Sequence, residues 1–314
     1  MAIDQFKVLV LRGGPDRERQ VSLKSGAAVA AALVRAGHEV VESDICPDDL
    51  SILDQGSFDI IFPVLHGSWG EGGPLQETLD ERGLPYVGCR HEAADLCMDK
   101  VRTKLVLIEH ELPTPLFELL QRGQRPKLAA PLVLKPPLEG SSIGLEICLN
   151  NSDIQPALKR LDRHESLLAE SFVCGRELTV GVIADASGLR VLPPICIVPA
   201  AGAYDFAAKY DRDDTKYLFD PAEAGLDEQV FANARTLAKK AFEILGCRHL
   251  SRVDLMADAS GALWIIEVNT IPGFTDHSLL PKAAAHMGID MSALVDRLIR
   301  QAIHDHRAIG SQQH

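Results

Sequence analysis

Apolar residues in the first hundred positions form short runs that alternate with longer segments of helical period. Lys7–Arg12 is a short apolar strand that ends at Gly13-Gly14, and Val21–Ala36 has the period of a helix. The alternation continues with predicted strands at Val40–Asp44, Asp59–Leu65 and Pro85–Gly88 and a predicted helix at Leu75–Arg82. Buried strands that alternate with helices predict a parallel sheet with helices on both faces, so we expect an α/β fold here.

The pattern changes near Asp99, where a helix is predicted to run toward Leu112. Later segments are predicted as strands at Pro131–Lys135, Leu167–Val173, Glu177–Ile183, from Val191 onward, Leu250–Met256 and Ala262–Val268. Helices are predicted at Ile154–Leu161, Asp227–Leu245 and Met291–His304, and a long loop at Ala200–Ala222. No internal repeat or low-complexity linker separates these segments, so we expect closely packed domains with ligands in the clefts between them.

The composition is typical of a globular protein, with 46% hydrophobic and 24% charged residues. At roughly 100–200 residues per domain, 314 residues predict two or three domains. The longest apolar run, Gly26–Val34, is shorter than the roughly 20 residues of a membrane span. Nothing near Met1 resembles a signal peptide, so we expect a cytoplasmic protein.

The charge balance argues against two classes of partner. Lys and Arg number 32 against 44 Asp and Glu, a net charge of −12, whereas nucleic acids and anionic membranes require a basic surface. We therefore expect no nucleic-acid or membrane partner. The seven cysteines are scattered and lack CxxC spacing, which fits reduced thiols better than disulfides or a zinc site.

Two neighbouring predicted strands carry the clearest chemical signal. Side chains alternate along a strand, so Arg252 and Asp254 share one face, and Glu267 and Asn269 share another. If the strands pair as a hairpin, three oxygen ligands and a guanidinium converge, and hard oxygen ligands suit Mg²⁺. An ordinary surface hairpin is the alternative. It is disfavoured because the rest of both strands is apolar, and buried charges require partners.

The segment after this hairpin offers a possible anion site. Pro272-Gly273 forms a turn, and Thr275 or Asp276 can cap a helix and leave the N–H groups of Ser278 and Leu279 near its positive end. A plain turn followed by a capped helix explains the same residues equally well.

Four further segments are weaker signals on their own. Lys135–Gly144 could fold over phosphates, although it lacks the P-loop pattern and a flexible surface loop is the default interpretation. Gly13–Ser22 is a glycine-rich turn in which Glu18 could favour the helix dipole or hold an ammonium group. His66 follows a strand end, where α/β proteins bind ligands, but a lone histidine is more often structural. Tyr204–Tyr210, in the long loop, suggests a lid.

In this order and spacing, the segments resemble the D-alanine–D-alanine ligase family of ATP-grasp enzymes over nearly the whole chain. The matching stretches are GGPDRERQVSLKSG, LHGSWGEGGPLQ, MDKVRTK, LVLKPPLEGSSIG, AESFVCGRELTV, YDFAAKY, RVDLM and IIEVNTIPGFTDHSLLPKAA. The resemblance implies a three-domain ATP-grasp architecture: an α/β substrate domain at 1–98, a central ATP-grasp domain at 99–184 and a C-terminal catalytic domain at 185–314. It also implies ATP as co-substrate, two Mg²⁺ ions for which Mn²⁺ can substitute, D-alanine substrates and a homodimer.

The family's residue roles carry over position by position. The resemblance assigns Glu18 to the first substrate's ammonium, with Ser141 and Tyr210 linking it to two loops, and His66 to the first substrate. It assigns Arg252 and the Gly273 N–H to the oxyanion, and Ser278 and Leu279 to the second carboxylate. The expected magnesium ligands are Asp254, Glu267 and Asn269, and the expected ATP ligands are Lys100, Lys135, Lys209, the adenine hinge Glu170, Ser171, Phe172 and Val173, and the ribose acceptor Glu177.

Two departures and several alternatives accompany this resemblance. The family usually has Glu-Asp-Gly where this chain has Glu71-Gly72-Gly73, and the lid is about one residue longer before Pro221. D-Alanine–D-lactate ligases carry histidine where Tyr210 stands, which favours the dipeptide product. A D-alanine–D-serine ligase, another ATP-grasp carboxylate–amine ligase and a catalytically inactive ATP-binding protein are the remaining alternatives. The intact acidic hairpin disfavours the last of these.

Overall fold

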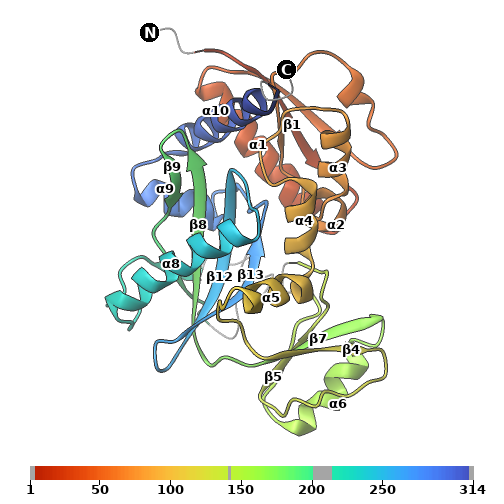
Figure 1. Ribbon diagram of the computed structural model, residues 1–314, viewed down its shortest axis with the longest axis vertical. Helices are drawn as coiled ribbons and strands as arrows, with labels where there is room; N and C mark the ends of the chain where they lie inside the picture. The colour runs from red at the N-terminus through yellow and green to blue at the C-terminus, as the bar shows by residue number, and fades with distance from the viewer. Residues whose placement is uncertain (1–3, 141–142, 201–213, 311–314) are drawn as a thin grey trace.

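The computed structural model describes residues 4–140, 143–200 and 214–310, which form three sheets stacked along the long axis of the molecule (Figure 1). The first is the parallel sheet β2-β1-β3, with β1 at Lys7–Gly13, β2 at Glu39–Ile45 and β3 at Ile60–Pro63. Tyr86 adds one bridge to Ile61. The helical segments of this unit are α1 (Arg19–Arg35), a 3-10 turn (Ser51–Asp54), α2 (Gly67–Gly70), α3 (Pro74–Glu81) and α4 (His91–Met98).

Helices cover both faces of this sheet, as the alternation of apolar segments predicts. Val8 and Val10 of β1 point into one core with α1 and the C-terminal helix α10 (Met291–Gly310). Leu9 and Leu11, on the opposite face, pack with Leu75 and Leu79 of α3. The expected parallel α/β unit is therefore confirmed, and both its faces are buried.

A four-stranded antiparallel sheet, in the order β4-β7-β5-β6, lies at the opposite end of the molecule (Figure 1). It has its own core, in which Leu134, Ile154 and Ala169 are buried. Its strands β4 and β6 are not predicted from the pattern because they are short and half-exposed. The elements are β4 (Phe117–Gln121), β5 (Leu132–Lys135), β6 (Glu146–Cys148), α6 (Asn151–Arg160) and β7 (Ser166–Ser171).

The third sheet lies between the other two and has the order β11-β10-β8-β12-β13, with β9 paired to β8. Helix α8 covers one face, where Ala234 and Phe242 pack with Val253 and Leu255. No helix in the described ranges combines the length and apolar character that crossing a membrane requires. The elements are α5 (Lys100–Glu109), β8 (Gly175–Asp185), β9 (Gly188–Val191), β10 (Ile195–Val198), β11 (Lys216–Leu218), α8 (Glu228–Ile244), β12 (Leu250–Asp258), β13 (Leu263–Asn269) and α9 (Leu279–His286).

The sheets divide the chain at a different place from the expected boundary at 184/185. Strand β8 pairs with β12 over all but its last two residues, from Gly175 opposite Asp258 to Ile183 opposite Leu250. The change from one sheet to the next therefore falls between Ser171 and Gly175. We propose 172–174 as the boundary between the second and third domains, because a continuous sheet is not divided between two domains.

The first unit and the third sheet share a hydrophobic core. Phe62 of β3 meets Phe274, which follows β13, edge to face with ring centroids 5.5 Å apart. Ile183 of β8 and Leu280 of α9 belong to the same buried cluster. This contact brings loops of the first unit against the loop that follows β13.

A buried histidine joins the same two parts of the molecule. His249 precedes β12 with φ +63°, a left-handed conformation uncommon for residues other than glycine. Its Nδ1 accepts a hydrogen bond from the Gly88 N–H at 3.0 Å, so Nε2 carries the proton and faces Asp305 of α10 at 3.3 Å. Burial lowers the pKa of His249 to about 4, and the hydrogen bond from His249 lowers the pKa of Asp305 to about 2.

His249→Asn tests this linkage. The unfolded histidine has a pKa of about 6.5, so between pH 6.5 and 4 the unfolded chain binds about one more proton at this position than the folded chain. The free energy of unfolding of the wild type therefore falls as the pH is lowered through this range. Asparagine tolerates positive φ and does not titrate. Urea unfolding at pH 4.5 and 7 should show a smaller fall for His249→Asn, and an equal fall would contradict this assignment.

Candidate active site

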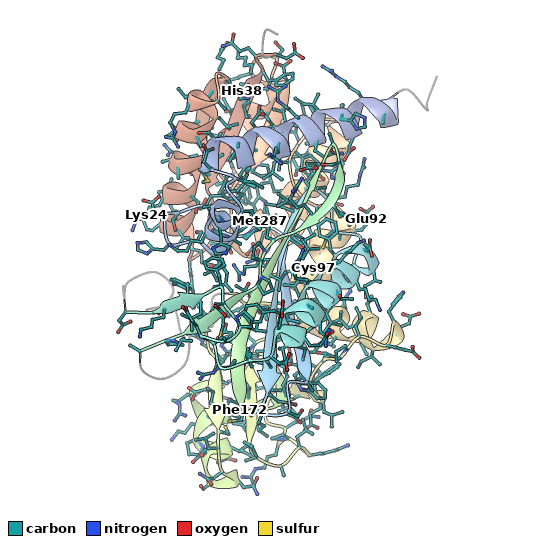
Figure 2. All side chains as sticks on the ribbon, turned by 90° about the vertical axis from the view of Figure 1, so that its left-hand side faces the viewer. Lys24, His38, Glu92, Cys97, Phe172 and Met287 are labelled. Carbon is teal, nitrogen blue, oxygen red and sulfur yellow. The ribbon has the colours of Figure 1, made fainter. Side chains whose placement is uncertain are left out.

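A pocket lies where the first unit, the loop after β5 and the β12–β13 hairpin meet. Cys97, labelled in the middle of Figure 2, forms part of its wall. The pocket contains nine of the expected site residues: Glu18, His66, Lys100, Arg252, Glu267, Asn269, Gly273, Ser278 and Leu279. The remaining lining residues are Glu71, Cys97, Met98, Gly140, Val268, Thr270, Thr275 and His277. Ser141, Lys209 and Tyr210 lie outside the described residues.

The β12–β13 hairpin aligns the acidic residues as expected. The antiparallel register sets Arg252 opposite Asn269 and Asp254 opposite Glu267, with an irregularity directly after Asp254. Arg252 donates two hydrogen bonds to the Asp254 carboxylate, at 2.9 and 2.7 Å. Thr179 of the neighbouring strand β8 donates a third to Asp254, at 2.6 Å. The predicted pairing of the two strands as a hairpin is confirmed, and sequence reasoning missed Thr179.

These oxygens fit a hard divalent cation. Asp254 and Glu267 are carboxylates side by side on paired strands, an arrangement that is unfavourable unless positive charge lies between or beside them. The Asn269 amide oxygen accepts a hydrogen bond from the Ile271 N–H at 3.0 Å, which fixes its orientation. Among the described residues no group of three or more His, Cys, Asp or Glu has metal-binding geometry. The candidate set is instead two carboxylates and an amide, which leaves positions for water and phosphate oxygens.

Three buried lysines flank the hairpin and the four-stranded sheet. Lys100 Nζ lies 3.7 Å from Glu267 Oε2 and donates to the Glu139 carbonyl at 2.7 Å. Burial lowers the pKa of Lys100, with the charge of Glu267 opposing this effect. Lys135 and Lys104 both form ion pairs with Glu170, which is buried at the end of β7. Sequence reasoning assigned no role to Lys104.

The expected adenine hinge is the crossing between two sheets. The Ser171 N–H donates to the Leu116 carbonyl at 2.9 Å, and the Phe172 N–H donates to the Pro131 carbonyl at 3.0 Å. Figure 2 shows Phe172 at the level where the chain leaves the four-stranded sheet. Val173 completes the crossing, and Glu177 follows on β8, opposite Ile197. The segment is thus an extended connection with fixed ends.

His66 and Glu71 form a buried pair beside Glu18. His66 Nδ1 lies 3.6 Å from Glu71 Oε2, and Glu71 Oε1 accepts a hydrogen bond from the Gly67 N–H at 3.0 Å. Burial alone would lower the pKa of His66, but the Glu71 and Glu18 carboxylates outweigh this effect and raise it. The buried His66 Nε2 has no hydrogen-bond partner among the described residues, which is typical of an atom that awaits a ligand. Glu71, five residues after His66, is a site residue whose role the sequence did not indicate.

The anion site after β13 differs from expectation in one detail. Ser278, and not Thr275 or Asp276, is the N-cap of α9, because its backbone is extended and helical residues begin at Leu279. The Ser278 N–H donates to the Thr275 carbonyl at 2.9 Å, so the expectation that this group stays available was wrong. Leu279 stands in the first turn of α9, where N–H groups have no acceptor within the helix.

Gly72 is required by a close backbone approach. A Cβ at this position would lie 2.4 Å from the Ser68 carbonyl oxygen, whereas non-bonded carbon and oxygen atoms normally stay more than 3.0 Å apart. The aspartate that the family usually has here cannot be accommodated in this loop conformation.

Comparison with solved structures identifies the fold. A crystal structure of D-alanine–D-alanine ligase from Bacillus anthracis complexed with ATP matches with a TM-score of 0.81 at 27% identity, and the match covers 97% of this chain and 99% of that one. The ligase from Coxiella burnetii, at 24% identity, has the same fold with a TM-score of 0.81 and 98% of both chains covered. The three-sheet fold and its central pocket define an ATP-grasp enzyme.

Sequence comparison gives the family. The D-ala D-ala ligase C-terminus family model matches residues 109–300. The D-alanine–D-alanine ligase of Bordetella petrii is 41% identical over 94% of this chain and 92% of its own length. D-Alanine–D-alanine ligase B of Chromobacterium violaceum is 43% identical over 90% of this chain and 93% of its own. The chain therefore belongs to the D-alanine–D-alanine ligase family.

Gly72→Ala should lower the free energy of unfolding by about 1–3 kcal/mol, because the backbone at Ser68 must move to admit the methyl group. Gly140→Ala is the matched control, since its Cβ would meet the nearest atom, Glu18 Oε2, at an ordinary 3.4 Å. Urea unfolding of the two variants provides the measurement. Equal stability of Gly72→Ala and Gly140→Ala would disprove the close approach.

Proposed function

We propose that this chain ligates two D-alanine molecules to D-alanyl-D-alanine with hydrolysis of ATP to ADP and phosphate, for peptidoglycan precursor synthesis. The observation that carries this proposal is one pocket that is lined by Glu18, Arg252, Glu267, Asn269 and the start of α9. Such a pocket can hold an ammonium group, an oxyanion, a metal–phosphate group and a second carboxylate at once.

The proposed reaction has two steps. The carboxylate of the first D-alanine attacks the γ-phosphorus of ATP, which forms an acyl phosphate and releases ADP. The amine of the second D-alanine attacks the acyl carbon, loses a proton, and the tetrahedral intermediate expels phosphate. Glu18 holds the ammonium group of the first substrate, and the Ser278 hydroxyl and the Leu279 N–H bind the carboxylate of the second.

Two anions must approach each other in the first step, so positive charge is required around them. Lys100 and Lys135 supply part of this charge, and Lys209 is proposed to supply more. Asp254, Glu267 and Asn269 would hold Mg²⁺ or Mn²⁺, and the ion would neutralise charge on the phosphate oxygens. Thr179 and Arg252 orient Asp254 for this purpose.

Arg252 and the Gly273 N–H are the proposed donors to the oxyanion. The two hydrogen bonds to Asp254 fix the plane of the Arg252 guanidinium at the pocket wall before any substrate arrives. Donors that are already in place stabilise developing charge without reorganisation during the reaction. Ser141 and Tyr210 are proposed to connect Glu18 to the two loops that exclude water from the acyl phosphate.

The main alternatives to the proposed function differ in the identity of the second substrate. Tyr210 favours an amine over D-lactate, whereas D-serine differs from D-alanine only by a hydroxyl group, which pockets reject weakly. A homodimer and a cytoplasmic location are part of the proposal, on the strength of the family alone.

The function is tested by phosphate release with ATP and Mg²⁺, with products identified by mass. D-Alanine should give D-alanyl-D-alanine, and L-alanine should give no product. D-Alanine with D-lactate or D-serine should give mainly the D-alanine dipeptide. A mixed product in excess would indicate a D-alanine–D-lactate or D-alanine–D-serine ligase of the same family. ATP binding without any product would indicate a catalytically inactive ATP-binding protein.

Arg252→Ala should keep nucleotide binding and lose about 10²-fold or more in turnover, as expected for loss of an oxyanion donor. Arg190→Ala removes an arginine that is paired with Asp185 away from the pocket and serves as the control. Steady-state kinetics and ADP binding by calorimetry give the two readouts. Turnover within a few-fold of the wild type would refute the role of Arg252.

A further inference from the structure

A buried carboxylate stands between two ammonium groups at the edge of the four-stranded sheet. Glu170 is 3% exposed, and its two oxygens form ion pairs with Lys104 and Lys135, which are 1% and 6% exposed. Lys135, on β5, is one of the proposed phosphate ligands. Lys104 lies on α5 and has no part in the reaction as described so far.

Lys104 and Glu170 come from different structural units. Glu170 is on β7, in the sheet with its own core, whereas α5 packs through Leu107 into the core of the third sheet. The ion pair therefore crosses from one unit to the other. Its carboxylate partner, Glu170, is the first residue of the proposed adenine hinge.

Hydrogen bonds that lead to the third sheet fix the position of the Lys104 ammonium group. Its Nζ donates to Thr114 Oγ1 at 2.6 Å, and Thr114 Oγ1 donates to the Ile265 carbonyl of β13 at 2.8 Å. The Phe117 ring lies 5.6 Å from Nζ and covers it. Two hydrogen bonds thus connect the Lys104 ammonium to the strand that carries Glu267 and Asn269.

The charges of the group explain why two lysines are present. A buried carboxylate is costly unless it is paired. Burial lowers the pKa of Lys104 to about 8, with Glu170 opposing the effect, so Lys104 still carries its proton near neutral pH. If Lys135 turns toward a phosphate, Lys104 remains to neutralise Glu170 and to hold its direction.

We propose that Lys104 is a positioning residue for nucleotide recognition, which holds Glu170 as an acceptor for the exocyclic amine of adenine. The inference rests on the proposed function, in which Glu170 begins the adenine hinge. A purine with a carbonyl oxygen in place of that amine would set two acceptors against each other. Lys104 therefore also determines the preference for adenine over hypoxanthine nucleotides.

The test measures binding of ADP and IDP, with Mg²⁺, to the whole protein by calorimetry. The wild type should bind ADP at least about 10-fold more tightly than IDP, as expected for a hydrogen bond to a charged group. Lys104→Met should weaken ADP binding by about 10-fold or more and bring the ADP-to-IDP ratio close to one. Lys239→Met, an exposed lysine of α8 paired with Glu243, is the matched control and should bind like the wild type.

A second comparison separates positioning from a general structural effect. If Lys104 acts through Glu170, Lys104→Met should cause no further loss of ADP affinity in a Glu170→Gln background. Additive losses, or an unchanged ADP-to-IDP ratio in folded Lys104→Met, would overturn the proposal. If Lys104→Met does not fold, Thr114→Val removes the acceptor that fixes Nζ and should lower the ratio to an intermediate value; an unchanged ratio there also overturns it.

The two proposals can fail separately. Nucleotide binding does not require turnover. A protein that binds ADP but forms no dipeptide therefore refutes the proposed function, and the ADP and IDP affinities still decide the role of Lys104. A wild type with no preference for ADP over IDP refutes the role of Lys104 even if the dipeptide is formed.

Discussion

The antiparallel register of β12 and β13 is the constraint on which the rest of the site depends. It sets Asp254 beside Glu267, and two neighbouring carboxylates are stable only where positive charge surrounds them. Arg252 and Lys100 provide that charge from the protein, and Glu267 and Asn269 line the pocket, where a cation and phosphates are proposed to bind. A shift of one residue in this pairing would turn the carboxylates to the opposite face and abolish the site.

Two different kinds of junction then place the substrates around the hairpin. The first unit is joined to the third sheet by a shared apolar core, with Phe62 against Phe274, so Glu18 and His66 have a fixed position relative to Arg252. The four-stranded sheet has a separate core and meets the hairpin side through polar contacts such as Lys104–Glu170. The proposed amino-acid side of the pocket is therefore joined to the hairpin by apolar packing, and the proposed nucleotide side by buried ion pairs.

Periodicity predicted the elements that are long and have one consistent period, such as α1, α8 and the β12–β13 hairpin. It missed β4, β6, β9, β11 and α4, which are three to eight residues long and therefore too short to show a clear period. The resemblance supplied the site residues, and the structure gathers nine of them in one pocket. Lys104 and Thr179 could not be found in this way, because each acts through a partner that only the folded chain brings near. Glu71 lies close to His66 in sequence, but the loop between them gives no period that predicts their contact. The cap of α9 was misplaced because Thr275, Asp276 and Ser278 are all good N-caps and only the backbone path selects Ser278.

The separate core of the four-stranded sheet has a thermodynamic consequence. Opening this sheet exposes less apolar surface than unfolding the whole molecule, so its amide protons can exchange with solvent through a subglobal opening. If a nucleotide binds between Glu170 and the hairpin, as proposed, it binds the folded sheet, and by mass action its concentration lowers the frequency of this opening. In a cell, the free nucleotide concentration relative to its Kd would thus govern how long this part of the chain resists proteolysis.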